Sequence, residues 1–221
     1  MIDQPDSDLT DEGAPPVAIR TSIDVLPDES LTGIAGVISD LGRLDRAVYG
    51  VIADTPTPNL DVPLRELSSL ANHSKIWFAI AGGLALFGGE KRRRAAVSGV
   101  VSIGAASLIA NAVVKPFARR RRPDREGENV PDVRAVPMPT STSFPSGHSA
   151  SAFAFAQAVG KELPFIGVPL RGLAGAVAYS RVHTGVHYPS DVIIGSIIGA
   201  SIGDVTLALL RYGKRRHTAS G

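Results

Sequence analysis

Hydrophobic positions in the first third of the chain recur at helical spacing among polar and charged residues. This pattern predicts one amphipathic stretch over residues 29–54 and a second that starts at Asp61. Gly42 is expected to divide the first stretch, and the TPTPN segment at 55–59 separates the two. Neither stretch contains 18 uncharged residues, so both are expected to lie on the surface of a core or a bilayer instead of crossing one.

Beyond Lys75 the chain becomes mostly apolar, and its pattern of apolar segments predicts five further helices. Among them, 95–114 is a run of twenty uncharged residues, about 30 Å of helix and long enough to cross a hydrocarbon core. We therefore expect an all-α fold, a polytopic membrane bundle with about five membrane helices preceded by amphipathic N-terminal helices. The five predicted segments are 76–89, 95–114, 149–160, 164–180 and 192–210.

A soluble all-α bundle is the alternative to the membrane fold, and the small residues of the last helix favour the bilayer. Gly195, Gly199 and Gly203 repeat at four-residue spacing, which lets helix backbones approach closely in lipid. In a soluble helix each glycine would cost about 1 kcal/mol relative to alanine. The stripe fits packing within one molecule or against a second copy, so the sequence leaves a homo-oligomer open.

Basic residues predict the orientation of the chain in a cell membrane. If every apolar segment crosses, Lys91–Arg94, Lys161 and Lys214–Arg216 share one side, which the positive-inside rule places in the cytoplasm. The loops 115–147 and 181–190 would then share the extracytoplasmic face.

Three features do not follow that topology. The Arg119–Arg122 run lies on the outer side and needs another explanation. Only Arg122 has motif spacing, and its three neighbours are expected either to bind lipid headgroups or a second phosphate, or to have no specific role. Arg171 and Asp204 lie within apolar segments, where a charge is costly, and are expected near helix ends or facing the bundle.

Composition narrows the class of protein further. The 221 residues carry 23 Lys+Arg against 21 Asp+Glu, a formal net charge of +2, which argues against a nucleic-acid partner. The lack of Cys excludes disulfides, thiolate metal sites and cysteine catalysis. The first residues lack the layout of a secretory signal peptide, so insertion is expected to use an internal segment. Four regions are predicted: a flexible acidic tail (1–28), amphipathic interfacial helices (29–75), the membrane core (76–212) and a basic C-terminal tail (213–221).

Three short motifs lie in the two outer loops. The first pairs Lys115 with Arg122-Pro123, the second is Pro-Ser-Gly-His at 145–148, and the third runs from Ser180-Arg181 through His187 to Asp191. Lysine and arginine can surround a phosphoryl group, and arginine adds bidentate contacts. Ser146 and Gly147 precede a predicted helix, so their backbone N–H groups are expected to form an anion site.

The histidines of these motifs suit acid–base and nucleophilic chemistry near neutral pH. His187 and Asp191 are four residues apart, which places the carboxylate beside the imidazole, where it can fix the tautomer and raise the basicity of the ring. His73 and His217 are expected to be solvated or structural. His183 lies within the third motif but off its fixed positions, so contact with substrate is left open for it.

Together the three motifs resemble those of the type-2 phosphatidic acid phosphatase superfamily, over about residues 60–210. The resemblance implies that His187 is the nucleophile, carrying the phosphoryl group as a phosphohistidine, that Asp191 orients it, and that His148 is the general acid. It assigns phosphate binding to five further residues. It implies no metal and no cofactor, because Lys and Arg side chains balance the charge of the phosphate. The phosphate-binding set is Lys115, Arg122, Ser146, Gly147 and Arg181.

The function expected from the resemblance is a membrane lipid phosphate phosphatase acting at the extracytoplasmic face, with polyprenyl diphosphate the favoured substrate and membrane lipids as its surroundings. Phosphatidate, phosphatidylglycerophosphate and a polyprenyl-phosphosugar phosphate are alternative substrates. A vanadium haloperoxidase-like enzyme and an inactive membrane scaffold are the other classes. The apolar helices argue against the haloperoxidase, and the intact motif residues argue against the scaffold.

Overall fold

The computed structural model describes residues 33–118, 120–127 and 130–219, and this part of the chain is built from helices and loops. The acidic tail and Arg119 lie outside the described residues. The α-helices are α1 (Ile34–Asp54), α2 (Pro58–Leu70), α3 (Lys75–Leu86), α4 (Glu90–Leu108), α5 (Gly147–Glu162), α6 (Pro164–His183) and α7 (Pro189–Ala219). A 3-10 turn η1 (Asn72–Ser74) precedes α3, a π-helical segment η2 (Ile109–Val114) extends α4, and the turn η3 (Asp132–Arg134) lies in the long loop.

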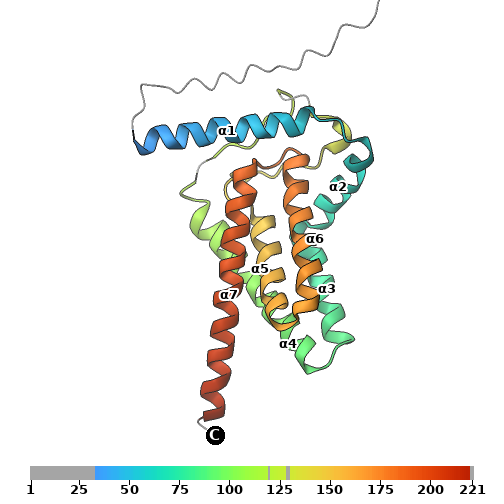
Figure 1. The fold of residues 1–221 in the computed structure, drawn as a ribbon, viewed down its shortest axis with the longest axis vertical. Helices are drawn as coiled ribbons and strands as arrows, with labels where there is room; N and C mark the ends of the chain where they lie inside the picture. The colour runs from blue at the N-terminus through green and yellow to red at the C-terminus, as the bar shows by residue number, and fades with distance from the viewer. Residues whose placement is uncertain (1–32, 119, 128–129, 220–221) are drawn as a thin grey trace, which may run out of the picture.

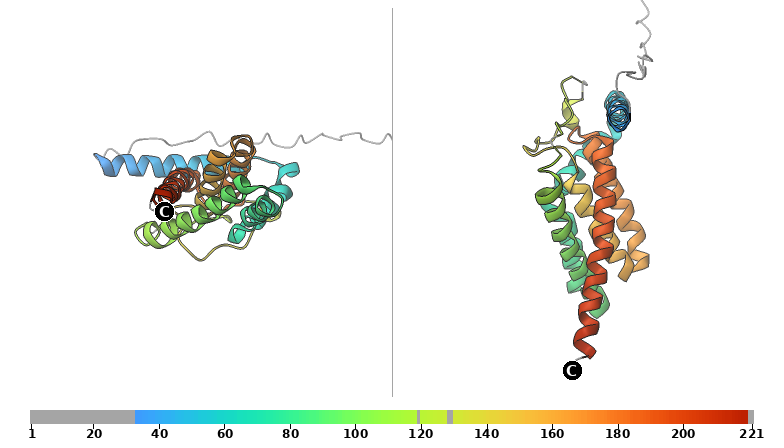
Figure 2. Two further views of the ribbon diagram at one scale, coloured as in Figure 1. Left: turned by 90° about the horizontal axis from the view of Figure 1, so that it is seen from below. Right: turned by 90° about the vertical axis from the view of Figure 1, so that its left-hand side faces the viewer.

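Helices α3 to α7 form an elongated bundle, and α1 lies across one end of it (Figures 1 and 2). Helix α5 is the centre, packed against α4, α6 and α7. Its alanines at 150, 152, 154, 156 and 158 are fully buried. Small side chains let three helices surround α5 at short range, as the sequence predicts for a membrane bundle.

The glycine stripe of α7 packs closely against α5. A Cβ at Gly195 would lie 2.6 Å from the backbone oxygen of Ser146, the residue that caps α5. A Cβ at Gly199 or Gly203 would lie 2.1 or 2.8 Å from a backbone oxygen of α5 itself. Real Cβ atoms essentially never come within 3.0 Å of another heavy atom, so this seam requires glycine. The stripe therefore packs within the monomer.

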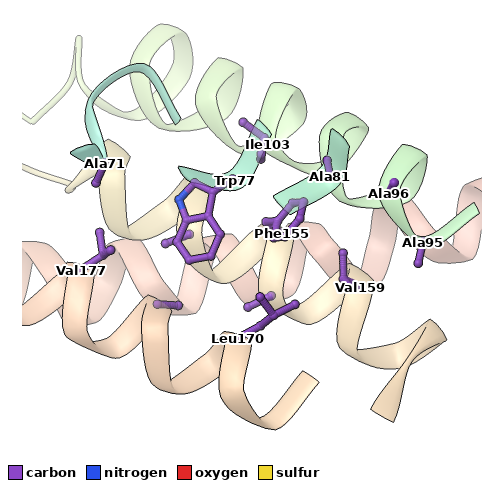
Figure 3. Packing of buried hydrophobic residues seen from close by; sticks show 13 residues of the cluster. Ala71, Trp77, Ala81, Ala95, Ala96, Ile103, Phe155, Val159, Leu170 and Val177 are labelled. Carbon is purple, nitrogen blue, oxygen red and sulfur yellow. The ribbon is translucent and has the colours of Figure 1, made fainter. Parts of the chain in front are cut away.

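Larger side chains fill the space between α3, α4, α5 and α6. Trp77 packs against Phe155 with ring centroids 5.4 Å apart (Figure 3). Val159, Leu170 and Val177 belong to the same buried cluster.

The five predicted apolar segments correspond to α3 through α7. Among the helices that the structure describes, two are long and apolar enough to cross a membrane by themselves, Glu90–Val114 and Pro189–Arg216. Helix α3 has 12 residues and α5 has 16, shorter than a simple span.

Two predicted helix boundaries were wrong. Gly42 does not divide the first stretch, because α1 is continuous from Ile34 to Asp54. Helix α2 begins at Pro58 instead of Asp61, since proline is well tolerated in the first helical turn. Helix α7 extends to Ala219, so the first residues of the predicted basic C-terminal tail continue this helix.

The two charges within apolar segments are linked through α5. Gln157 donates to Asp204 at 2.9 Å and accepts from Arg171 at 3.1 Å. Lys161 also pairs with Asp204, at 3.4 Å. Polar contacts between α5, α6 and α7 thus satisfy groups that would be costly if left unpaired in lipid.

Candidate active site

The three motifs meet at the end of the bundle where α1 lies. Helices α5 and α7 begin at this end and α4 and α6 run toward it (Figure 1), so residues distant in sequence surround one cavity of about 190 Å³. Five of the eight predicted site residues line it: Lys115, Arg122, Gly147, His148 and His187.

His187 is held by groups on both sides of its ring. Its Nδ1 lies 3.5 Å from Oδ2 of Asp191 and 3.5 Å from Oγ of Ser143, and its Nε2 lies 3.4 Å from a guanidinium nitrogen of Arg122. Only 2% of His187 is exposed. Burial lowers its pKa to about 4, with the Asp191 hydrogen bond opposing this shift and the charge of Arg122 adding to it. The ring is therefore neutral near pH 7, which leaves Nε2 with a free lone pair if Nδ1 carries the proton.

Asp191 is fully buried at the start of α7 and accepts hydrogen bonds at both oxygens. Oδ2 accepts from Ser143 Oγ and from the backbone N–H of Tyr188 at 2.8 Å. Oδ1 accepts from Arg120 at 2.9 Å. These contacts fix the carboxylate plane, so Asp191 can hold the imidazole in one orientation.

Lys115 and Arg122 lie together on the cavity wall. Lys115 Nζ and a guanidinium nitrogen of Arg122 each donate to Ser141 Oγ at 3.2 Å. Burial and the neighbouring Arg122 lower the pKa of Lys115 below its ordinary value. Arg122 also donates to the backbone oxygens of Ser141 and Val186, at 2.9 and 2.6 Å. Two cations held at one hydroxyl make a site for a dianionic phosphoryl group.

The second motif forms the beginning of α5. Ser146 caps the helix, its Oγ accepting from the N–H of Ser149. The prediction that the Ser146 N–H would bind phosphate needs correction, because that group donates to the backbone oxygen of Asp191 at 2.9 Å. Gly147 is the first residue of the helix and lines the cavity beside Asn111. His148 reaches Oδ1 of Asn72 through Nε2 at 2.9 Å.

Arg181 is not among the residues that line the cavity. It is 1% exposed and donates to the backbone oxygen and the Oγ of Ser68, at 3.1 and 2.6 Å. Its Nε is buried without a hydrogen-bond partner in the described part of the chain. A guanidinium with an unused donor is costly to bury.

His183, for which contact with substrate was left open, binds Asp61 and is not among the residues that line the cavity. Its Nε2 lies 3.0 Å from Oδ1 of Asp61, which also accepts from Arg134 at 2.8 Å. Arg134 is fully buried and ties the long loop to the α1–α2 junction through the backbone oxygens of Ala53 and Thr55. His73, expected to be solvated or structural, is exposed and lies at the cavity lining.

Sequence reasoning missed several residues of the site. Ser143, Ser141 and Asn72 carry no motif signal, since single serines and asparagines are common in loops. Arg120 lies within the arginine run, but the spacing of the first motif selects Arg122. The contact between Arg120 and Asp191 spans 71 positions.

Comparisons with known proteins relate the chain to a family. A family model described as the PAP2 superfamily matches residues 95–215. The chain is 34% identical over 168 residues to a decaprenylphosphoryl-5-phosphoribose phosphatase from Mycobacterium tuberculosis, covering 72% of this chain and 84% of that protein. It is 29% identical over 138 residues to an undecaprenyl-diphosphatase from Sulfolobus acidocaldarius, covering 61% of this chain and 63% of that protein.

The fold also matches a solved structure. The crystal structure of LpxE from Aquifex aeolicus aligns with a TM-score of 0.61 and 28% identity, covering 75% of this chain and 95% of that one. The three motifs, the helical fold and the family match over more than half of the sequence lead to one conclusion: the chain belongs to the PAP2 superfamily and is a membrane phosphatase of lipid phosphates.

Proposed function

We propose that this protein removes a phosphoryl group from a polyprenyl-linked phosphate by way of a phosphohistidine at His187. The observation that carries the proposal is the placement of His187, with Nδ1 toward Asp191 and Nε2 toward Arg122 inside the cavity that also holds Lys115 and His148. This arrangement provides a nucleophile, a residue that orients it, cations for the phosphoryl oxygens and a second histidine for proton transfer.

The reaction proceeds in two displacements. Nε2 of His187 attacks phosphorus while the bond from phosphorus to the leaving oxygen breaks, and His148 gives that oxygen a proton. Water then attacks the phosphohistidine, the P–N bond breaks and inorganic phosphate leaves, with His148 accepting a proton from the water. Lys115 and Arg122 stabilise the charge on the phosphoryl oxygens in both steps, and Arg181 Nε is the further donor we assign to them.

The chemistry needs no metal in this proposal. Within the residues that the structure describes, no group of three or more His, Asp or Glu side chains is arranged to hold a metal ion. The cations of the site are the groups that balance the phosphate charge. We therefore expect full turnover in EDTA, and a loss of turnover that added Mg²⁺ or Zn²⁺ restores would refute this part of the mechanism.

Two polyprenyl substrates are supported by relatives. The mycobacterial relative is named for a decaprenylphosphoryl sugar phosphate and is covered over 84% of its length, which favours a phosphate monoester on a lipid-linked sugar. The archaeal relative is named for undecaprenyl diphosphate, which keeps polyprenyl diphosphate as the second candidate. Phosphate release should be compared in mixed micelles across these two lipids, phosphatidate and phosphatidylglycerophosphate. Preference for either glycerolipid would exclude the polyprenyl assignment.

A labelled-phosphate trap tests the intermediate. Substrate carrying ³²P on the transferred phosphoryl group should label the wild-type chain in an acid-labile, base-stable form, as expected for a phosphoramidate. His187→Ala should neither label nor turn over. His148→Ala should slow the first displacement strongly with an alkyl leaving group and little with p-nitrophenolate, which needs no proton. Because His148 also accepts the proton from water in the second displacement, this variant should accumulate the labelled phosphohistidine with p-nitrophenyl phosphate. Labelling of His187→Ala would place the nucleophile elsewhere.

Charge and exposure support a multi-pass orientation with the active site outside. The clusters Lys91–Arg94 and Lys214–Arg216 lie at the N-terminal end of α4 and the C-terminal end of α7, opposite the site (Figure 1). By the positive-inside rule, this arrangement supports an extracytoplasmic face for the site. Arg120 and Arg122, which opposed this rule, are both engaged in the site.

Helix α1 fits the outer membrane surface. Its apolar stripe stays 40–64% exposed and is spaced to share one face: Val37, Leu41, Leu44, Val48 and Val51. An exposed apolar face on a helix lying across the bundle end suits the boundary between headgroups and acyl chains.

A further inference from the structure

Arg120 is the one described side chain that contacts Oδ1 of Asp191. Ser143 and the Tyr188 N–H both bind Oδ2, the oxygen on the imidazole side. Arg120 and Ser143 are themselves neighbours, because the Ser143 N–H donates to the backbone oxygen of Arg120 at 2.9 Å. The two oxygens of the carboxylate are thus held from opposite sides, and Arg120 supplies one side.

Arg120 is in turn anchored to α1. Its second guanidinium nitrogen pairs with Oδ2 of Asp45, which is buried on α1. The Cζ atom of the Arg120 guanidinium lies over the ring of Tyr188, the residue next to His187, at 4.2 Å from the ring centroid. A planar guanidinium that contacts two carboxylates and an aromatic face has little freedom to move.

Asp45 also caps the helix that carries Asp191. It accepts from the backbone N–H and the Oγ of Ser190, at 2.8 and 2.6 Å, in the first turn of α7. A carboxylate at this position satisfies an unpaired N–H and interacts favourably with the helix dipole. Asp45 therefore supports Asp191 twice, through Arg120 and through the backbone that bears it.

This support comes from outside the part of the chain that matches the family. The family model matches residues 95–215, whereas Asp45 lies on α1, before the matched range begins. We infer that Asp45 and Arg120 are positioning residues for the phosphatase reaction, through which α1, at the membrane surface, holds Asp191 and so His187 in the attacking geometry. The inference rests on the role given to Asp191 in the proposed function.

Without Arg120, two consequences follow for the site. The carboxylate loses its only described contact at Oδ1 and can rotate about the bond to its Cβ atom, which misaligns the Nδ1 contact. The negative charges of Asp45 and Asp191 also lose the cation between them. Misplacement of a reacting group by about 1 Å can cost about 100-fold in rate, whereas substrate binding by Lys115 and Arg122 is untouched.

The test compares Arg120→Ala with Arg121→Ala in the full-length protein in mixed micelles. Arg121 is the adjacent, exposed arginine and gives the same change of charge. We expect Arg120→Ala to lower kcat about 10- to 100-fold with KM within about twofold, and Arg121→Ala to resemble wild type. Millimolar guanidinium should restore much of kcat in Arg120→Ala, because its side chain is 27% exposed and the vacated position is open to solvent.

A second pair of variants tests the contribution of α1. Asp45→Asn removes the charge that anchors Arg120, and Asp40→Asn makes the same change at an exposed position on α1. We expect a smaller loss of kcat in Asp45→Asn than in Arg120→Ala, no loss in Asp40→Asn, and less than additive losses in the double variant, since both residues act on one carboxylate.

The outcomes separate this inference from the proposed mechanism. If Arg120→Ala matches Arg121→Ala in kcat, or loses kcat only as far as its unfolding temperature falls and without rescue by guanidinium, the positioning role is refuted. In either case Asp191→Ala should still be inactive if the proposed function holds. Full turnover in Asp191→Ala would refute the mechanism and this inference together.

Discussion

The seam between α5 and α7 gives the sharpest prediction, because it sets the distance between two parts of the site. Helix α5 begins with Gly147 and His148, and α7 begins two residues before Asp191. A Cβ at Gly199 would lie 2.1 Å from the backbone oxygen of Ala150, whereas ordinary contact starts at 3.4 Å. The Cβ of an alanine would thus be 1.3 Å too close to a backbone atom, which cannot move by itself. Gly199→Ala must therefore push the two helices apart.

The expected cost follows from this displacement. Overpacking of a tight contact costs about 1–3 kcal/mol of unfolding free energy, and we expect Gly199→Ala at the upper end of that range. A shift of about 1 Å between the helices should also lower kcat by up to about 100-fold. Gly203→Ala, where the nearest oxygen would be 2.8 Å away, should cost less on both counts.

Glycines with open surroundings provide the control. A Cβ at Gly104 or Gly172 would meet nothing within 4 Å, so alanine there should leave kcat unchanged and alter stability by no more than about 1 kcal/mol, in the stabilising direction. Thermal unfolding in one detergent and kcat on one lipid would rank the variants. Should Gly199→Ala unfold at the same temperature as Gly172→Ala, the seam does not hold the helices at the distance described.

Three further predictions concern charged groups. Because burial lowers the pKa of His187 to about 4, ¹⁵N NMR of the resting protein should show this ring neutral down to about pH 5, and a ring that is protonated at pH 6 would contradict this. In the unfolded chain the same ring takes up a proton already at about pH 6.5. The free energy of unfolding should therefore fall as the pH drops from about 6.5 toward 4. Arg134→Met leaves Asp61 buried without its main partner and should lower the unfolding free energy by about 3–5 kcal/mol, measured in denaturant, whereas a neutral effect would show that water replaces the contact. Arg181→Lys keeps the charge but loses the planar donor set that binds Ser68, so we expect about tenfold lower kcat/KM, and wild-type kinetics would exclude a directional role.

The sequence by itself determined the chemical groups of the site and much of the helical framework. Five helices correspond to the five apolar segments, and the glycine stripe of α7 is a seam as its spacing indicated. These features could be predicted because the helical period and the motif spacing are local properties of the chain. Lys115, Arg122, His148 and His187 line one cavity as the motifs required.

Only the tertiary structure decided which of several equivalent residues hold the site together. Nothing local separates Arg120 from its neighbours in the run, or Asp45 from the other acidic residues of α1. Their roles arise from contacts that span 71 and 145 positions. The same holds for Ser146, whose N–H is taken by the backbone of Asp191. A hydrogen bond depends on atoms brought within about 3 Å, and for residues so far apart in sequence that distance is set by how the helices pack.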